Sequence, residues 1–261
     1  MQRIALVTGA SSGIGEAAAR RLVADGYHVI LVARREDRLA DLAADLSAAS
    51  VIAADLVAGD APARVRAFVE AERGRLDLLV NNAGGAWRGR FDDGGWDNVR
   101  RHMELNFDAP VRLTEALLPL LRASAPSAIV NVASVAGRIS RANSGAYSAS
   151  KFALIGWSDA LHLEERKHGV HVGLVLPGFV ATEGFPQREL LDRPLTRWAV
   201  STPDKVADAI ADTAAGAAER YVPRPYALVP ALQGLIPGLA RRLSGSRALT
   251  PSTSADASAQ R

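Results

Sequence analysis

Residues 3–15 read Arg3-Ile-Ala-Leu-Val-Thr8-Gly9-Ala-Ser-Ser-Gly13-Ile-Gly15, and this stretch decides the fold. Its apolar first half is typical of a buried strand, and its glycines lead into a helical pattern that ends at Gly26. Glycines at such a turn let backbone N–H groups at the start of the helix approach a pyrophosphate, which side chains would block. The stretch therefore predicts a strand, a turn and a helix that together bind a dinucleotide. A glycine turn without a ligand is the alternative.

Strand-like runs alternate with helical ones along the rest of the chain. The predicted strands cover residues 3–8, 28–33, 50–54, 76–81, 127–133 and 170–176. A short seventh strand is expected near Tyr221, after a helix from Asp204 to Ala215 that Thr202 caps and Pro203 begins. This alternation predicts an α/β fold of the Rossmann type, with a doubly wound, mainly seven-stranded parallel sheet and helices on both faces. The site is expected at the carboxyl ends of the strands.

Tyr147-Ser-Ala-Ser-Lys151 places a phenol and an ammonium four residues apart, on one face of a helix. A nearby cation favours the phenolate and lowers the pKa of the phenol, so this pair can donate and accept a proton. Besides Lys151, the chain has lysine only at positions 167 and 205, which argues against a chance pairing. A surface pair on an amphipathic helix is the alternative reading.

The residues after the second predicted strand indicate which cofactor is bound. Arg34 and Arg35 stand where an arginine accommodates the 2′-phosphate of NADP, whereas an acidic residue would bond the 2′-hydroxyl of NAD. We therefore predict NADP(H). NAD(H) remains an alternative, because Glu36 and Asp37 follow directly and can pair with the arginines. Asp55, at the end of the third apolar run, is either a ligand of the adenine amino group or a helix cap.

Over nearly its whole length the sequence resembles the short-chain dehydrogenase/reductase family, in its compact single-domain branch. The matching segments are the cofactor turn Thr8-Gly9-Ala10-Ser11-Ser12-Gly13-Ile14-Gly15, the sheet-stabilising motif Asn81-Asn82-Ala83-Gly84, and Tyr147 with Lys151. Ser134 matches the catalytic serine, Asn106 matches the asparagine that completes the catalytic tetrad, and Pro177-Gly178 with Thr182 matches the segment that borders the nicotinamide.

The resemblance implies a full set of site residues. The catalytic residues are Asn106, Ser134, Tyr147 and Lys151. The cofactor contacts are Gly9, Ser11, Ser12, Gly13, Ile14, Gly15, Arg34, Arg35, Asp55, Leu56, Asn82, Ala83, Gly84, Tyr147, Lys151, Pro177, Gly178, Val180 and Thr182. Ser12 departs from the pattern, because many NADP-preferring relatives carry a basic residue there. Arg34 and Arg35 are thus the main candidates for the 2′-phosphate.

The implied chemistry is the reversible reduction of a ketone or aldehyde to an alcohol. Negative charge grows on the substrate oxygen during reduction, so the site must supply a proton and hydrogen bonds to that oxygen. Tyr147 is the predicted proton donor, Ser134 holds the carbonyl oxygen, and Lys151 lowers the pKa of Tyr147 and binds the ribose hydroxyls. A 3-oxoacyl thioester reductase is one alternative. A non-catalytic NADP-binding regulator or scaffold is another, although the intact tetrad argues against it.

Three further segments carry expectations about the site. Pro110 lacks the N–H that would bond the carbonyl of Asn106, which predicts that this carbonyl holds a water linking Lys151 to solvent. Residues 183–200 resemble a mobile substrate lid whose apolar side chains favour a lipophilic substrate, with permanent packing on the core as the alternative: Phe185, Pro186, Leu190, Leu191, Leu195 and Trp198. Trp87 and Phe91 either line the pocket or are buried by packing.

Composition and length suggest one domain. The 261 residues are 48% hydrophobic, and we assign residues 1–225 to the dinucleotide-binding domain, 226–243 to an apolar extension of it, and 244–261 to a disordered tail. The extension is expected to pack on protein, with peripheral contact to a membrane as the alternative. The tail is rich in serine, alanine and threonine.

Charge and residue usage narrow the function classes. The absence of cysteine excludes disulfides and thiolate chemistry, and no His, Asp and Glu cluster has the spacing of a metal site. A net charge of +3 with scattered arginines gives no support to nucleic-acid binding. The chain begins directly with its first strand, which predicts a cytoplasmic protein. The resemblance implies a homodimer or homotetramer, formed through the helices that contain Asn106 and Tyr147.

Overall fold

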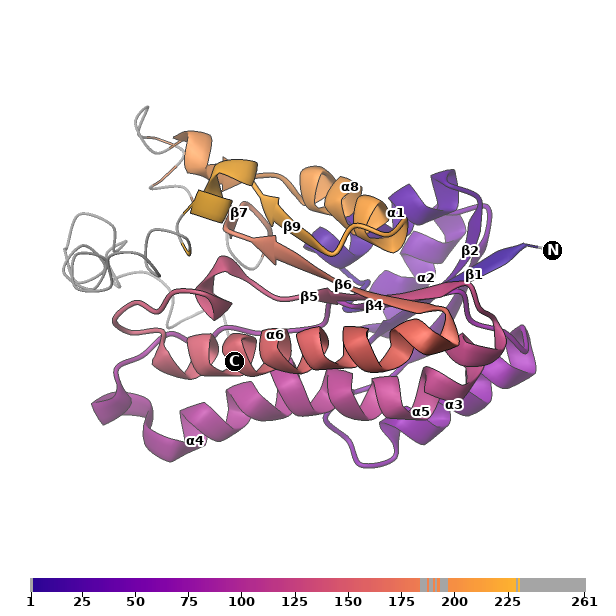
Figure 1. Ribbon diagram of the computed structural model, residues 1–261, viewed down its shortest axis with the longest axis horizontal. Coiled ribbons are helices and arrows are strands. Elements are labelled where there is room, and N and C mark those ends of the chain that lie inside the picture. The colour runs from indigo at the N-terminus through magenta and orange to yellow at the C-terminus, as the bar shows by residue number, and fades with distance from the viewer. Residues whose placement is uncertain are drawn as a thin grey trace.

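The centre of the fold is a seven-stranded parallel sheet in the order β3-β2-β1-β4-β5-β6-β9 (Figure 1). The computed structural model describes residues 2–183, 187, 190, 192, 197–228 and 230. The strands are β1 (Arg3–Thr8), β2 (Tyr27–Ala33), β3 (Ala49–Ala53), β4 (Leu78–Asn81), β5 (Ser127–Val132), β6 (Val170–Pro177) and β9 (Glu219–Val222). The predicted doubly wound sheet is confirmed. For the six strands predicted with bounds, the first and last residues lie within two residues of those observed.

Helices cover both faces of this sheet (Figure 1). One layer contains α1 (Gly13–Ala24), α2 (Glu36–Asp45) and α8 (Pro203–Ala214). The opposite layer contains α3 (Ala61–Glu72), α4 (Phe91–Met103), α5 (Ala109–Ala123) and α6 (Gly145–Glu165). Alternate side chains of one strand serve the two layers, since Ala5 and Val7 lie in one hydrophobic core and Ile4 and Leu6 in the other. An apolar run such as 4–7 is therefore buried on both faces, as a parallel sheet requires.

Helix α8, which follows the predicted substrate lid at residues 183–200, begins as predicted. The Thr202 hydroxyl accepts a hydrogen bond from the backbone N–H of Lys205, and Pro203 is the first residue of α8. A small second sheet before it was not predicted, because its strands, β7 (Phe179–Val180) and β8 (Val200–Ser201), are two residues long. This pairing places residues 179–180, before the predicted lid, beside residues 200–201 at its end.

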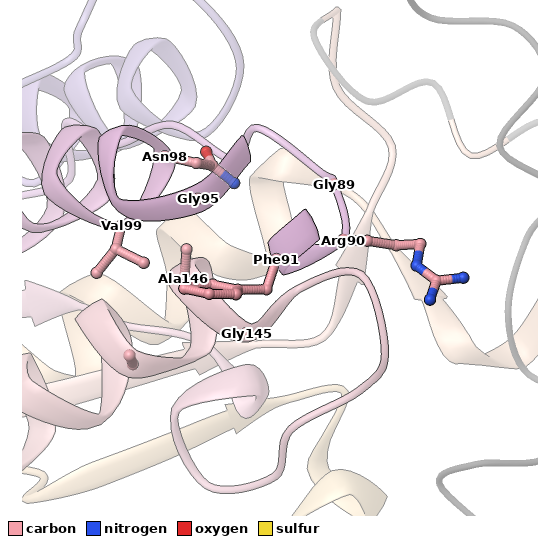
Figure 2. Close-up of a pocket in the computed structure, with 9 residues that line it drawn as sticks. Gly89, Arg90, Phe91, Gly95, Asn98, Val99, Gly145 and Ala146 are labelled. Atoms are coloured by element: carbon pink, nitrogen blue, oxygen red, sulfur yellow. The ribbon is translucent and has the colours of Figure 1, made fainter. Parts of the chain in front are cut away.

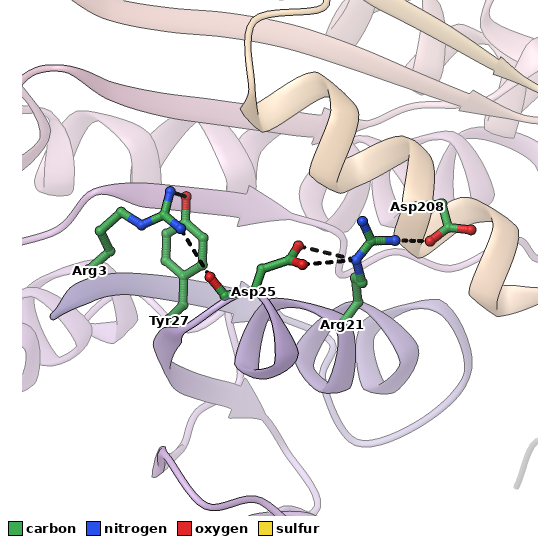
Figure 3. Close-up of polar contacts among 5 residues, drawn as sticks. All are labelled: Arg3, Arg21, Asp25, Tyr27 and Asp208. Carbon is green, nitrogen blue, oxygen red and sulfur yellow. Dashed lines mark hydrogen bonds and ion pairs between the residues drawn. The ribbon is translucent and has the colours of Figure 1, made fainter.

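Polar contacts at the amino ends of the strands fasten the first layer (Figure 3). The guanidinium of Arg3 donates to the Tyr27 hydroxyl at 3.1 Å and to the Asp25 carbonyl at 3.0 Å. Arg21 pairs with the Asp25 carboxylate and also with Asp208, which joins α1 to α8. These contacts lie away from the carboxyl ends of the strands, where the sequence motifs gather.

A π-helical turn, Glu104–Asp108, interrupts the long helical stretch between β4 and β5. The N–H of Ala109 bonds to the carbonyl of Glu104, five residues back, and Pro110 follows at once. Asn106 lies inside this turn and is buried. Within the described ranges, no helix combines the length and apolar character needed to cross a bilayer. Residues 231–261, which include the tail and most of the apolar extension, lie outside the described residues.

Candidate active site

The glycine turn between β1 and α1 leaves a bare backbone surface. Gly9 has φ of +66°, and a Cβ added at Gly15 would lie 2.2 Å from the Gly9 carbonyl oxygen. A Cβ at Gly13 would meet the Thr182 side chain at 3.3 Å, so the turn and the segment after β6 face each other. Among the described residues, no side chain caps the start of α1, so its first N–H groups are available to a phosphate group, which fits a dinucleotide. The side chain of Ile14 packs on the core.

Arg35 closes the outer side of this turn. Its guanidinium donates to the hydroxyls of Ser11 and Ser12, at 3.1 Å and 2.9 Å. Arg34 is exposed, and the ion pairs of the described residues join neither arginine to Glu36 or Asp37. The alternative in which these arginines only pair with the start of α2 is therefore not what the structure has. A positive charge stands beside the turn, where a 2′-phosphate is expected.

Thr8 and Asn82 lock the ends of β1 and β4 together. The Thr8 hydroxyl accepts from the backbone N–H of Asn82 and of Ala83, both at 2.9 Å, and donates to the Val80 carbonyl. The amide of Asn82 donates to the Thr8 carbonyl at 2.9 Å. The motif thus fixes the carboxyl ends of these two strands relative to each other.

Two predicted cofactor residues, Asp55 and Leu56, follow the end of β3. The carboxylate of Asp55 accepts from the N–H of Val57 at 3.2 Å, which makes a local turn, whereas α3 begins later, after Asp60. Asp55 is therefore not a helix cap, and its role toward adenine stays a prediction. The side chain of Leu56 is buried in the core, as is that of Val180 in β7, so any cofactor contact by either residue uses backbone atoms.

Ser134, Tyr147 and Lys151 meet above the ends of β5 and β6. Ser134 follows β5, and its hydroxyl donates to the Pro177 carbonyl at 3.3 Å and accepts from the N–H of Ala136. Tyr147 and Lys151 lie on α6, with the ammonium 6.0 Å from the centroid of the phenol ring. The ammonium also donates to the Val132 carbonyl at 2.9 Å. The structure thus brings together three residues that are separate in the sequence.

Burial is the main cause of the pKa shifts of Tyr147 and Lys151. It raises the pKa of Tyr147, and a side-chain hydrogen bond with Ser134 and the charge of Arg88 oppose that rise. Burial also lowers the pKa of Lys151 to about 8. The Tyr147 pKa is therefore raised and not lowered as expected, because the loss of hydration outweighs the nearby positive charges. Arg88 contributes to this electrostatic field, and no motif or spacing in the sequence indicates that role.

The side chain of Asn106 holds the loop after β4. Its amide exchanges two hydrogen bonds with the backbone of Gly85, each 2.9 Å, and donates to the Ser150 hydroxyl on α6 at 3.1 Å. Gly84 lies between this amide and Lys151, since a Cβ there would be 3.0 Å from Asn106 Oδ1 and 3.6 Å from Lys151 Nζ. Asn106 therefore couples the loop to the active-site helix. The predicted water on its carbonyl stays a prediction.

His102 is a site residue that sequence reasoning missed. Its buried ring accepts from the N–H of Trp87 at 3.0 Å through Nε2, donates from Nδ1 to the Asn98 carbonyl at 2.8 Å, and lies 6.1 Å from the Tyr147 ring. Burial is the main cause that lowers the pKa of His102, so the ring is neutral. Its spacing of four residues from Asn106 was the available signal, because that spacing puts both on one helix face.

Trp87 and Phe91 have different surroundings. Trp87 packs edge-on against His102, and the Arg101 guanidinium covers its ring at 3.8 Å from the centroid. Phe91 is 74% exposed and lines a cavity of about 140 Å³ with Val99 and Ala146, between α4 and the start of α6 (Figure 2). Trp87 is thus half-buried by packing, and Phe91 borders a cavity whose lining contains none of the catalytic residues.

The segment after β6 is packed against the end of the described chain. A Cβ at Gly178 would lie 2.3 Å from the Tyr226 ring, so only glycine fits beside that ring. Tyr226 donates to the Ala199 carbonyl and stacks on Trp198, which is 62% exposed. Pro177 and Gly178 are thus fixed from behind. Of the predicted lid, residues 184–186, 188, 189, 191 and 193–196 lie outside the described residues, which include Phe185, Pro186, Leu191 and Leu195.

The described residues fit a dinucleotide better than a metal. The open turn at Gly9–Gly15, with Arg35 at one side and Thr182 opposite, accepts a phosphorylated ligand. Among the described residues, no group of three or more His, Asp and Glu side chains could hold a metal ion.

Comparisons with known proteins agree with this geometry. A family model described as short chain dehydrogenase matches residues 3–190. Dehydrogenase/reductase SDR family member 7B from Bos taurus is 33% identical over 194 residues, which cover 69% of this chain and 58% of the relative. The probable short-chain type dehydrogenase/reductase VdlC from Helicobacter pylori is 37% identical, with 67% and 64% covered. The chain thus spans less than two thirds of these relatives.

Two solved structures are similar over most of the chain. A short-chain dehydrogenase from Streptomyces avermitilis has a TM-score of 0.78 and 33% identity, covering 93% of this chain and 97% of that one. The RhlG/NADP active-site complex from Pseudomonas aeruginosa has a TM-score of 0.75 and 30% identity, covering 84% and 94%. The family model and these structures together show that the chain belongs to the short-chain dehydrogenase family.

Proposed function

We propose that this protein is an NADP(H)-dependent oxidoreductase that reversibly reduces a ketone or aldehyde to an alcohol. The observation that carries the proposal is the meeting of Ser134, Tyr147 and Lys151 beside an open glycine turn. NADPH, when bound, supplies the hydride. Family membership supports the oxidoreductase class, and the catalytic residues support the assignment to carbonyl and alcohol groups.

Each catalytic residue has a role that suits its surroundings. The Ser134 hydroxyl, held by the N–H of Ala136, donates to the carbonyl oxygen of the substrate. Tyr147 is protonated at neutral pH because burial raises its pKa, so it donates the proton that the growing alkoxide needs. Lys151 lies on the same face of α6 and contributes positive charge and a donor toward the ribose hydroxyls. Asn106 positions the loop that borders these residues.

Arg35 supports a preference for the phosphorylated cofactor. Its guanidinium is held at the turn by Ser11 and Ser12, and an arginine binds a phosphate through two parallel hydrogen bonds. The NADP in the similar Pseudomonas aeruginosa complex agrees with this assignment. NAD(H) is the alternative. Measuring the affinities for NADPH and NADH under the same conditions decides between the two cofactors.

We further propose a lipophilic substrate, a cytoplasmic location and a homodimer or homotetramer. Aromatic side chains beside the nicotinamide-bordering segment, Phe179, Trp198 and Tyr226, support the first of these. The oligomer would form through the helices near Asn106 and Tyr147, and sedimentation of the purified protein measures its size.

The test compares wild-type protein with the Tyr147→Phe variant on ketones, aldehydes, 3-oxoacyl thioesters and secondary alcohols, with NADPH or NADH and their oxidised forms. We expect turnover with the phosphorylated cofactor, and a loss of at least about a hundredfold in the variant. NADPH should still bind to the variant, which shows that the variant is folded. Cofactor binding without turnover by the wild type on the whole panel would replace this proposal with a regulatory role.

A further inference from the structure

We propose that the substrate carries a carboxylate, which Arg141 and Arg88 hold at the mouth of the active site while Ser134 and Tyr147 hold its carbonyl. This inference rests on the proposed function and adds the substrate class to it. It is carried by the placement of the two arginines, which neither the fold nor the predicted chemistry requires.

Arg141 lies in the loop between β5 and α6, six residues before Tyr147. Its guanidinium lies over the Phe179 ring, 4.9 Å from the centroid, beside the segment that borders the nicotinamide. Burial is the main cause that lowers the pKa of Arg141, so this charge is partly removed from water. Among the described residues, no carboxylate pairs with it and its side chain makes no hydrogen bond.

Arg88 lies in the loop after β4, and its exposed side chain lines a hollow that also contains Asp93 and Asp97. Its positive charge lowers the pKa of Tyr147 and that of Arg141, so it acts on both. The next residue joins the two loops, because the N–H of Gly89 donates to the carbonyl of Asn143 at 3.1 Å. The ion pairs among the described residues leave Arg88, like Arg141, without an acidic partner.

Other arginines in these loops are paired, which makes the contrast specific. Arg138 binds Glu219 at 3.1 Å, and Arg90 reaches Asp92 at 3.5 Å and points away from the cavity in Figure 2. The charges of Arg88 and Arg141 repel each other, and an anion bound between them would turn that repulsion into attraction. A carboxylate matches the fork of a guanidinium, which makes it the simplest anion for this place.

The arrangement also defines the shape of the substrate. The carbonyl end meets Ser134 and Tyr147, the anionic end meets the two arginines, and the Phe179 ring lies beside Arg141. An apolar body between a carbonyl and a carboxylate fits these three surfaces. An oxo acid, reduced to the corresponding hydroxy acid, is the class of compound that this describes.

The experiment measures binding and needs no turnover. Octanoate and octanamide differ only in charge, and each is titrated into the NADP⁺-loaded full chain by calorimetry. We expect octanoate to bind at least about tenfold more tightly than octanamide, since hydrogen bonds to charged groups contribute that much. Arg141→Gln and Arg88→Gln should each reduce this ratio, and the double variant should abolish it. Arg90→Gln removes a paired charge from the same loop and should leave the ratio unchanged.

The outcomes separate this inference from the proposed function. Equal binding of the two probes, no binding of either, or an unchanged ratio in the double variant would overturn the carboxylate subsite. Arg141→Lys keeps the charge and should retain part of the ratio, and unchanged NADP⁺ affinity shows that each variant is folded. A clear ratio without turnover on any carbonyl would uphold the subsite and refute the reductase. Turnover of neutral carbonyls together with equal binding of octanoate and octanamide would uphold the reductase and refute the carboxylate subsite.

Discussion

The guanidinium of Arg35 donates a hydrogen bond of 2.9 Å to the hydroxyl of Ser12, which lies 23 residues earlier in the chain. A second bond reaches the Ser11 hydroxyl at 3.1 Å. The side chain is thereby held over the glycine turn, and its charge occupies the place that a basic residue at position 12 would otherwise supply.

This contact predicts the effect of Arg35→Gln on cofactor choice. The dissociation constant for NADPH should rise about tenfold or more, because a charged hydrogen bond to the 2′-phosphate is lost, while that for NADH stays the same. Fluorescence titration of both cofactors measures this. Arg38→Gln is the matched control, since Arg38 faces Glu183 at 3.7 Å and makes no contact with the turn. Equal losses for both cofactors would contradict a role in reading the phosphate.

A second prediction concerns Gly178 and Tyr226. The Gly178→Ala variant should lose about 1–3 kcal/mol in free energy of unfolding, because its Cβ would overlap the Tyr226 ring. The double variant Gly178→Ala/Tyr226→Leu should recover part of that loss, which urea denaturation can measure. Gly145→Ala serves as the control, since a Cβ there meets nothing within 4 Å. Additive losses in the double variant would show that the two residues are not in contact.

The buried ammonium of Lys151 predicts a dependence of stability on pH. Its pKa is lowered from 10.5 to about 8 in the folded protein, so the unfolded chain binds more protons between these values. Lys151 should therefore add about 1 kcal/mol to the free energy of unfolding between pH 8 and pH 9, below the range in which the tyrosines, whose pKa values burial raises, begin to lower it. Lys151→Met should remove this rise, and Lys205→Met, on the exposed face of α8, should not. A rise that persists in Lys151→Met would assign it to other groups.

The bonds of Asn106 predict the cost of replacing its amide. Asn106→Asp keeps an acceptor for the Gly85 N–H, loses both donated bonds, and buries a charge. We expect a loss of about 2–4 kcal/mol in the free energy of unfolding. Hydrogen exchange should show faster exchange of the Gly85 N–H in Asn106→Ala, where its acceptor is gone. Unchanged exchange at Gly85 would contradict the anchoring role of Asn106.

The main sheet could be predicted because its strands are buried on both sides and read as apolar runs. The boundaries that differ have specific causes. β4 begins at Leu78, two residues late, because the N–H of Leu76 donates to the Ser124 hydroxyl and the Asp77 carboxylate accepts from the N–H of Ile4. Those contacts come from distant parts of the chain. The strands β7 and β8 are too short for any periodicity to mark them.

The catalytic residues could be placed because their types and spacing belong to a motif, whereas their electrostatics could not. The Tyr147 pKa is raised because of burial, which depends on every element packed around the ring. Arg88 and Arg141 act on the site through loops that only tertiary packing brings together. His102 resembled any polar residue of an amphipathic helix. Its neutral ring and its bond to Trp87 depend on the fold.

His102 and Asn106 bind the loop after β4 and thereby limit where insertions can occur in it. The two side chains hold Trp87 and Gly85 to a single helix face, so an insertion before Trp87 would break the register at both points. Beyond Trp87 the contacts of His102 and Asn106 end, and the stretch that carries Arg88 is tied to the loop after β5 through Gly89 and Asn143. New substrate preferences can therefore arise there by changes in loop length and sequence, while the proton-transfer machinery keeps its shape.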